Sequence, residues 1–332
     1  MGLIGYGMAG RVFHAPLISA VDGLELRSIV QRHGDEAAAR YPAAAIARDA
    51  AALFEDSAID LVVVATPNDS HFDLGRRAIE AGKHVVIDKP FTVSASEARA
   101  LIALARERSR ILTVFQNRRW EGDFLTIRRL LDAGVFGRLV SFEARFDRFR
   151  NVPKPNAWRE TDAAGSGILY DLGSHLVDQI LSLFGRPERV EADVRRERSF
   201  GSDDAFDIRM EYPGMRAFLR AGMLVREPAP RYTIRGTDAT FVKFGKDPQE
   251  ADLAAGRSPR EAGWGTDAPE QWGTLFSDRG EERIETLPGN YAGFYENVRD
   301  AVRGDAKLEV DPETAATTIE ILEKARRGWT KR

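Results

Sequence analysis

The 332-residue chain contains no cysteine. That absence excludes disulfide bonds, thiolate nucleophiles and cysteine-ligated zinc. Long apolar runs are missing as well, because no stretch reaches the roughly 18 apolar residues that can span a bilayer. The first residues, MGLIGYG, lack the basic start and the apolar segment of a secretory signal. We therefore expect a cytoplasmic protein that does not enter a membrane.

The chain also lacks an excess of charge of one sign. Its formal net charge is -3, so no basic surplus is present to neutralise a phosphate backbone, and nucleic acid is not an expected partner. Hydrophobic residues make up 43% and charged residues 30%, close to the globular average. A single core stops growing at roughly 250 to 300 residues, so this length predicts two domains.

Lysine is scarce: the 48 basic residues comprise eight lysines and 40 arginines. One of the eight, Lys89, follows the apolar run Val85–Ile87 and precedes Pro90, which favours an extended backbone at the lysine. An ammonium can lower its pKa on burial and share a proton, whereas a guanidinium stays charged. Lys89 is therefore a candidate for proton-transferring chemistry. A solvated loop lysine with its stem on apolar surface is the alternative.

The first 115 residues alternate short apolar runs with helical patterns, as βαβ units do. The predicted strands are Gly2–Ile4, Leu24–Val30, Leu61–Ala65, Val85–Ile87 and Ile111–Phe115. The predicted helices are Met8–Ala20, Gly34–Tyr41, Asp69–Ala81 and Ser94–Arg108, the last with a capping box of Ser94 and Glu97. This pattern predicts an N-terminal α/β domain, residues 1–115, with a Rossmann-type parallel sheet.

Residues 116–332 show no further βαβ alternation and predict an α+β domain. Its predicted helices are Phe124–Ala133, Gly167–Leu183, Tyr291–Arg303 and Pro312–Arg327. Its predicted strands are Leu139–Phe146, Val190–Arg195, Phe206–Tyr212, Ala217–Met223, Tyr232–Ile234 and Thr240–Phe244. The alternating pattern favours a mostly antiparallel open sheet. Residues 246–273, rich in glycine, proline and acidic residues, predict an exposed excursion.

A G-x-G-x-x-G motif stands between the first predicted strand and the first helix. In that position Gly5 makes a tight turn, Gly7 lets the backbone approach a pyrophosphate, and Gly10 lets helix and strand pack closely. A chance cluster of glycines in another α/β protein is the alternative. The motif predicts a dinucleotide in contact with Gly5, Tyr6, Gly7, Met8, Ala9 and Gly10.

The second strand ends in Ser28-Ile-Val-Gln-Arg32-His, without an acidic residue at its tip. NAD-binding folds usually place Asp or Glu there for the ribose 2′-hydroxyl, whereas NADP needs positive charge at its 2′-phosphate. We expect NADP rather than NAD, with Arg32 at the phosphate. In the alternative, Arg32 is a solvated turn residue and Asp35 or Glu36 binds the ribose.

Asp171 and His175 are four residues apart in a predicted helix and therefore share one face. A carboxylate there can orient the imidazole, whose ordinary pKa of about 6.5 suits acid-base chemistry. A pair that only caps or packs the helix is the alternative. Asp178 could extend the pair to a chelating site, but no second cluster supplies further ligands, so we predict no metal.

Donors and flat apolar faces, the combination that polyhydroxylated rings require, occur at Asn117–Trp120 and Trp158-Arg159. The predicted substrate-binding residues among them are Arg118, Trp120 and Trp158, with surface ion pairs and core packing as the alternatives. We expect Arg119 and Arg150 to be structural.

Four segments together resemble the Gfo/Idh/MocA oxidoreductases: the glycine loop, Ala65–His71, Glu80–Pro90 and Asp171–His175. Within that family, Phe13–Leu17, Gln116–Leu125 and Phe146–Arg150 are most similar to NADP-dependent scyllo-inositol dehydrogenases and their bacterial relatives. The resemblance runs nearly end to end and is more specific for fold and cofactor than for substrate. Asp88 departs from the family, which mostly has Glu before the lysine, so the carboxylate is kept with a shorter reach.

The resemblance implies that Lys89, Asp171 and His175 are catalytic. His175 would take a hydroxyl proton, Lys89 would hold and polarise the same oxygen, and Asp171 would bind a neighbouring hydroxyl or orient His175. Further cofactor contacts are expected at Thr66, Pro67, Asn68, His71, Asp88, Lys89, Pro90 and Gln116, with His71 equally explained as a cap or packing residue.

The expected reaction interconverts a secondary alcohol and a ketone on a small polyol, either a cyclitol or a sugar. The family also includes NAD(P)-binding regulators and glycosidases that use NAD without net redox, and these are the alternatives. The resemblance further implies that the open sheet forms the interface of a homo-oligomer, a dimer or tetramer.

Overall fold

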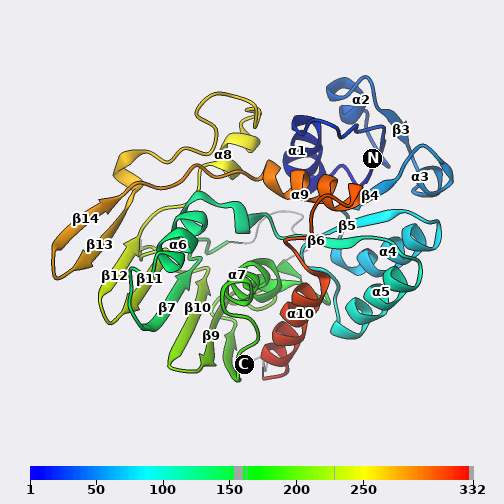
Figure 1. Ribbon diagram of the computed structural model, residues 1–332. Helices are drawn as coiled ribbons and strands as arrows, with labels where there is room; N and C mark the ends of the chain where they lie inside the picture. The colour runs from blue at the N-terminus through cyan, green and yellow to red at the C-terminus, as the bar shows by residue number, and fades with distance from the viewer. Residues whose placement is uncertain (153–159, 162, 228, 329–332) are drawn as a thin grey trace. The chain divides into compact units, whose positions relative to one another are not determined.

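The computed structural model describes residues 1–152, 160–161, 163–227 and 229–328, which form two compact units (Figure 1). Unit 1 comprises Met1–Trp120, Gln249–Trp264 and Asn290–Ala316. Unit 2 comprises Glu121–Pro248, Gly265–Gly289 and Thr317–Arg332. Two late segments of the chain are therefore part of the same unit as the first 120 residues.

Unit 1 is built on a six-stranded parallel sheet in the order β3-β2-β1-β4-β5-β6. The strands are β1 (Gly2–Ile4), β2 (Ser28–Val30), β3 (Ala45–Ala47), β4 (Leu61–Val64), β5 (His84–Asp88) and β6 (Leu112–Phe115). The strand order reverses between β1 and β4, and ligands of such sheets bind beyond the carboxyl ends of the strands at that switch point. The predicted Rossmann-type sheet is confirmed.

The helices of unit 1 follow the predicted alternation. They are a π-helical turn (Gly10–His14) that continues into α1 (Ala15–Ala20), α2 (Glu36–Arg40), α3 (Ala51–Glu55), α4 (His71–Glu80), α5 (Ala95–Glu107), α8 (Gln249–Ala254), α9 (Ala292–Arg303) and the start of α10 (Pro312–Arg327). The Ser94–Glu97 capping box is present at the start of α5, as predicted. The short β3 and α3 were not predicted, because a three-residue edge strand carries almost no periodic signal.

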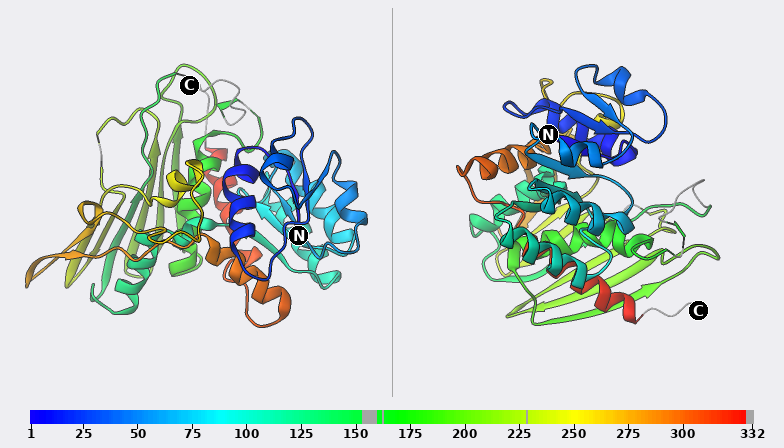
Figure 2. Two further views of the ribbon diagram at one scale, coloured as in Figure 1. Left: turned by 90° about the horizontal axis from the view of Figure 1, so that it is seen from above. Right: turned by 90° about the vertical axis from the view of Figure 1, so that its right-hand side faces the viewer.

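Unit 2 contains an eight-stranded sheet in the order β14-β13-β12-β11-β7-β10-β9-β8 (Figure 2). Its strands are β7 (Leu139–Arg145), β8 (Arg189–Arg195), β9 (Ala205–Tyr212), β10 (Met215–Gly222), β11 (Tyr232–Gly236), β12 (Ala239–Lys243), β13 (Gly273–Ser277) and β14 (Gly280–Ile284). All pairs are antiparallel except β7 with β10. The expectation of a mostly antiparallel open sheet is confirmed, although the β13–β14 hairpin was not predicted.

The two faces of this sheet differ in chemistry. One face is apolar and buried, with Phe142, Met210 and Leu219 in the core, and α6 (Gly122–Asp132) and α7 (Ser174–Phe184) cover it (Figure 1). The other face carries cross-strand ion pairs, such as the pairs of Asp207 with Arg195 at 2.8 Å and with Arg220 at 2.7 Å. Apolar and charged side chains therefore alternate between the two faces along each strand, with the period of two on which the strand predictions were based.

The predicted exposed excursion at 246–273 is mostly exposed in its middle part, residues 249–264, but this part is anchored at three points. Residues 249–264 include α8 and anchor themselves in unit 1 through three buried side chains, Gln249, Leu253 and Trp264. The Gln249 amide donates to the Trp120 carbonyl, and its oxygen accepts from the Trp264 indole and the Tyr291 backbone. Widely spaced anchors in a glycine-rich and acidic stretch leave no periodic pattern, so the sequence did not reveal these three buried side chains.

In the part of the chain that the structure describes, no helix is long and apolar enough to cross a membrane.

Candidate active site

The glycine loop joins β1 to the π-helical turn Gly10–His14 in unit 1. Gly5 has φ +101°, and a Cβ there would lie 2.5 Å from the Ala65 carbonyl oxygen. A Cβ at Gly10 would collide with the Gly5 carbonyl oxygen, whereas a Cβ at Gly7 would meet no described atom within 4 Å. Gly5 and Gly10 are thus required by close packing. Gly7 leaves an open backbone surface, which fits the approach of a pyrophosphate.

The tip of β2 is the place where the sequence predicts NADP rather than NAD. Arg32 is exposed there. Asp35 pairs with Arg48 at 2.7 Å, and Glu36 accepts a hydrogen bond from the Gln31 amide. The same Arg48 donates to the Gln31 carbonyl at 2.9 Å, which ties the loop to β3. Both acidic side chains are therefore engaged within the loop, and the Arg32 side chain is exposed to solvent.

The loop after β4 contains the predicted contacts Thr66, Pro67 and Asn68. The Thr66 and Ser70 hydroxyls lie 2.6 Å apart, and the Ser70 hydroxyl donates to the Pro67 carbonyl at 2.7 Å. Asn68 is buried. These bonds hold the loop in one conformation at the carboxyl edge of the sheet, where a dinucleotide is expected.

Asp88 and Lys89 lie at the carboxyl end of β5, and the Lys89–Pro90 peptide bond is cis. The buried Asp88 carboxylate accepts a 2.8 Å hydrogen bond from the Lys89 backbone N–H. Burial by itself would raise the pKa of Asp88, but His14, Lys89 and His71 outweigh it and lower that pKa. Asp88 is therefore a carboxylate at neutral pH. Lys89 itself is half-buried.

His71 begins α4 and is fully buried. One ring nitrogen lies 2.9 Å from the Pro90 carbonyl oxygen and the other lies 2.9 Å from the Thr66 carbonyl oxygen. Burial lowers the pKa of the imidazole, against the charge of Asp88 and the carbonyl oxygens. Of the two interpretations left open, the structure supports the packing residue, because both nitrogens already face backbone groups.

Gln116 follows β6 at the same edge of the sheet and is 2% exposed. Its amide oxygen is buried and has no hydrogen-bond partner among the described residues. A buried acceptor without a donor costs about 1 to 3 kcal/mol, so such a group is a place where a bound molecule can supply the missing donor. This observation and the open surface at Gly7 together fit a bound dinucleotide.

Two predicted substrate residues, Arg118 and Trp120, are buried in unit 1. Arg118 donates to Glu250 of α8 at 2.8 Å, and Trp120 packs edge-to-face on Phe294 of α9, with centroids 5.7 Å apart. For both, these contacts favour the structural alternative. Arg119 donates to the Glu309 carbonyl at 2.6 Å, a structural role like the one expected for it.

The candidate residues of unit 2 stand at the start of α7. Asp171 lies in a π-helical turn (Leu169–Gly173), and His175 lies in the first turn of α7. His175 is 4% exposed, and Asp171 lies 4.0 Å from the Arg148 guanidinium. π-Helical turns are uncommon and occur often at functional sites. The spacing of four residues still places the two side chains on one side of the helix.

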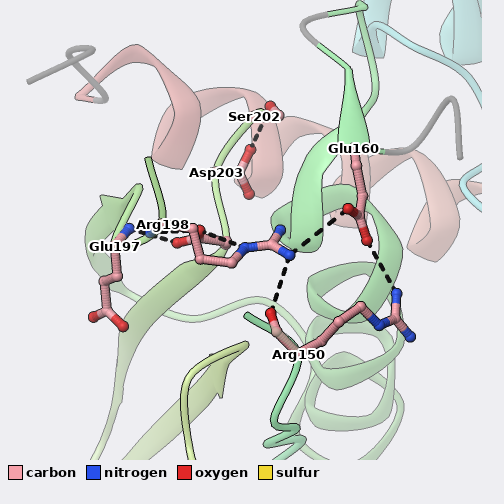
Figure 3. A network of polar contacts seen from close by, with 7 residues as sticks. Arg150, Glu160, Glu197, Arg198, Ser202 and Asp203 are labelled. Carbon is pink, nitrogen blue, oxygen red and sulfur yellow. Dashed lines mark hydrogen bonds and ion pairs between the residues drawn. The ribbon is translucent and has the colours of Figure 1, made fainter. Parts of the chain in front are cut away.

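A partly buried network of charges lies on the loops next to that turn (Figure 3). The Arg198 guanidinium pairs with Asp204 at 2.9 Å and with Glu160 at 3.7 Å, and it donates to the Arg150 carbonyl at 3.2 Å. Arg150 completes the network with a 3.0 Å bond to Glu160, a structural role like the one expected for it.

Trp158, the third predicted substrate residue, lies outside the described residues, as does Arg159. Among the residues that are described, no group of three or more His, Cys, Asp or Glu side chains is placed to hold a metal ion.

Sequence reasoning missed His14 and Tyr295, which are buried beside Asp88 in unit 1. The His14 ring lies 2.6 Å from the Tyr295 phenol and 3.6 Å from the Asp88 carboxylate. The two partners are 281 residues apart in the chain, so no local pattern connects them. The only local signal was a histidine inside an otherwise apolar helix start, Phe13–Leu17.

Comparisons with known proteins agree with this geometry. Residues 1–116 match the NAD-binding Rossmann fold of the GFO_IDH_MocA oxidoreductase family, and residues 128–328 match the C-terminal alpha/beta domain of the same family. The chain is 44% identical to the uncharacterized oxidoreductase YdgJ of Escherichia coli, over 97% of this chain and 94% of that protein.

It is also 38% identical to the scyllo-inositol 2-dehydrogenase (NADP(+)) IolW of Bacillus subtilis, over 98% of this chain and 92% of the relative. The solved structure of yvaA from Bacillus subtilis superposes with a TM-score of 0.95 at 37% identity, covering 98% of this chain and 94% of the other. The chain therefore belongs to the Gfo/Idh/MocA family of oxidoreductases.

Proposed function

We propose that this protein is an NADP-dependent dehydrogenase that interconverts a secondary alcohol and a ketone on a cyclitol or a sugar. The observation that carries the proposal is the placement of Lys89, one of only eight lysines, directly beyond the carboxyl end of β5, with its backbone N–H bonded to the buried Asp88 carboxylate. The similarity to an NADP-dependent scyllo-inositol 2-dehydrogenase supports the cyclitol and the cofactor.

The residues of unit 1 that would hold NADP are those at the carboxyl edge of the sheet. The open backbone at Gly7 would receive the pyrophosphate, the exposed Arg32 the 2′-phosphate, and the unsatisfied amide oxygen of Gln116 a donor of the cofactor. When bound, the nicotinamide supplies or accepts the hydride. The engagement of Asp35 with Arg48 and of Glu36 with Gln31 supports NADP over NAD.

The chain's own residues would move the proton. His175 takes the proton of the reacting hydroxyl in the oxidative direction and returns it in the reductive direction. Lys89 donates a hydrogen bond to the same oxygen and stabilises the negative charge that develops there. Asp171, near Arg148, accepts a hydrogen bond from a neighbouring hydroxyl or orients the His175 ring.

The experiment is a turnover assay that follows NADPH absorbance with a panel of inositols and aldoses, in both directions. We expect at least one cyclitol or sugar to change the absorbance, with a lower rate when NADH replaces NADPH. NADPH binding without turnover across the panel would contradict the proposal and favour a regulator. Release of a free sugar from a glycoside without net change in cofactor would favour a glycosidase.

A further inference from the structure

Two buried histidines lie on either side of Lys89 in unit 1. His14 and His71 are both 0% exposed, and neither takes part in the chemistry proposed above. His14 ends the π-helical turn after the glycine loop, and His71 begins α4. A buried imidazole loses its hydration and must recover hydrogen bonds inside the protein. The partners of these two rings therefore show what each one holds in place.

His71 holds the residue after Lys89. Its two ring nitrogens each lie 2.9 Å from a carbonyl oxygen, one from Pro90 and the other from Thr66. A carbonyl oxygen can only accept, and a neutral imidazole carries one N–H, so the ring donates to one of these two carbonyl oxygens and contacts the other. The ring thus connects the backbone that follows β5 to the backbone that follows β4, at the edge where the cofactor is expected.

His14 holds the residue before Lys89. Its Nε2 lies 3.6 Å from the Asp88 carboxylate, which is an electrostatic contact and too long for a hydrogen bond, and this nitrogen has no hydrogen-bond partner among the described residues. Burial raises the pKa of Tyr295 well above its ordinary value, so the phenol keeps its proton and donates to Nδ1 at 2.6 Å. The ring is also fixed by Phe115, whose centroid lies 4.3 Å away.

Asp88 connects His14 to the backbone of Lys89. The same carboxylate oxygen that faces His14 accepts the backbone N–H of Lys89 at 2.8 Å. Tyr295, His14, Asp88 and the Lys89 backbone therefore form one chain of polar contacts, and His71 closes the other side of the lysine at Pro90.

We propose that His14 and His71 are positioning residues for Lys89, one holding Asp88 and the other holding the Pro90 carbonyl, so that the tip of β5 keeps a single backbone conformation. The inference rests on the proposed function, in which Lys89 contacts the reacting oxygen. A displacement of about 1 Å in such a group can lower the rate about 100-fold, so a fixed backbone at this position has a direct effect on turnover.

The first test is hydrogen–deuterium exchange, which does not depend on turnover. Peptides that cover residues 86–93 are compared between wild type and His71→Leu, both saturated with NADPH. We expect exchange to be about tenfold faster in the variant at these peptides and unchanged at β2 of the same sheet. Unchanged exchange at residues 86–93 would overturn the positioning role.

The second test uses two amide variants as matched controls. His71→Asn keeps a donor near the Nδ1 position, which faces Pro90, whereas His71→Gln keeps a donor near the Nε2 position, which faces Thr66. We expect His71→Asn to retain kcat within about threefold of wild type, and His71→Gln and His71→Leu to lose about tenfold or more. Equal kcat in the two amide variants would overturn the inference, because a merely structural role does not distinguish the two carbonyls.

The third test addresses His14. His14→Phe keeps a ring against Phe115 and removes both polar contacts, while Tyr295→Phe removes only the phenol proton. We expect kcat to fall about tenfold in His14→Phe and less in Tyr295→Phe, with NADPH affinity within about twofold of wild type. Wild-type kcat in His14→Phe would contradict its part in the inference.

The outcomes separate this inference from the proposed function. Faster exchange at residues 86–93 in His71→Leu, together with a wild type that turns over no polyol, would reject the proposed reaction and retain the backbone clamp. Unchanged exchange together with an active wild type would reject the clamp and retain the reaction.

Discussion

The backbone N–H of Leu169 donates a 2.7 Å hydrogen bond to the buried carboxylate of Asp203. Leu169 begins the π-helical turn that carries Asp171. Gly167 permits this approach, because a Cβ at that position would collide with Asp203. The carboxylate also pairs with Arg326 of α10. A negative charge at the first N–H groups of a helix stabilises it, so Asp203 fixes the start of the helix that presents Asp171 and His175.

Asp203→Ala should lower both stability and turnover for this reason. Loss of a charged acceptor to a buried N–H costs about 1 to 3 kcal/mol of the free energy of unfolding, and we expect kcat to fall about tenfold at unchanged NADPH affinity. Urea unfolding, a turnover assay and NADPH fluorescence measure the three quantities. Ser202→Ala is the control, because it removes a neighbouring hydroxyl that donates to Asp203 and accepts from Arg326 but leaves the bond between Leu169 and Asp203 in place. Equal kcat in Asp203→Ala and the control would contradict the prediction.

Arg32→Asp should reverse the cofactor preference. The exposed guanidinium would be replaced by a carboxylate that repels the 2′-phosphate of NADP and can accept from the 2′-hydroxyl of NAD. We expect kcat/KM with NADPH to fall about 100-fold and kcat/KM with NADH to rise. Arg110→Asp makes the same charge change just before β6, at the amino-terminal edge of the same sheet. A shift of equal size in that variant would show that overall charge, not the position of Arg32, decides the preference.

Lys89→Arg should lose most of the turnover although it keeps the charge. A guanidinium is larger, planar and permanently protonated, so it cannot share a proton with the reacting oxygen as an ammonium can. We expect kcat to fall about 100-fold or more with NADPH affinity within a few-fold of wild type. Lys307→Arg, an exposed lysine in the loop between α9 and α10, is the control and should keep wild-type kcat. Near wild-type turnover of Lys89→Arg would refute a role for its proton.

The sequence predicted the parallel sheet and its glycine loop well, because both depend on local patterns. Val62 to Val64 form an apolar run, and Gly5, Gly7 and Gly10 have fixed spacing, so each is visible within a few residues. The same locality explains why Lys89 could be singled out from its neighbours alone. Such a motif predicts a strand before the glycines and a helix after them, and the structure can be compared with that prediction.

The environment of these residues could not be predicted, since it is made by contacts that are distant in sequence. The sequence proposed Trp120 as a substrate residue, whereas the structure buries it against Phe294 in unit 1. Asp88 lies beside His14, which is 74 positions earlier in the sequence, and His14 contacts Tyr295, which is 281 positions later. Burial and partner choice follow from the packing of whole elements, and no local period encodes them.

The last prediction concerns Asp123 at the start of α6, which is buried in unit 2. Burial and, after it, the charge of the nearby Glu121 raise the pKa of this carboxyl to about 6, against the opposing effect of Arg231 and Lys243. One of its oxygens accepts from the Phe124 N–H at 2.7 Å, and the other is buried and has no hydrogen-bond partner among the described residues. An uncharged carboxyl is therefore the better-tolerated form at this position.

The sign of the pH dependence follows from these two states. An unfolded Asp releases its proton at a pH of about 3.9, whereas the folded chain holds it up to about 6. The folded state thus binds more protons in that window, and the contribution of Asp123 to stability falls as pH rises from about 4 to about 6. Above that window the loss is complete and amounts to about 1 to 3 kcal/mol.

Asp123→Asn keeps the side-chain acceptor for Phe124 and cannot ionise. We expect the free energy of unfolding of the variant to exceed that of wild type increasingly between pH 4 and pH 6, by about 1 to 3 kcal/mol at the upper end. Urea unfolding at a series of pH values measures the difference. Asp278→Asn, in the exposed turn between β13 and β14, removes a carboxylate without this burial and should show no such trend. Parallel pH curves for wild type and Asp123→Asn would mean that Asp123 is already ionised in the folded protein at low pH.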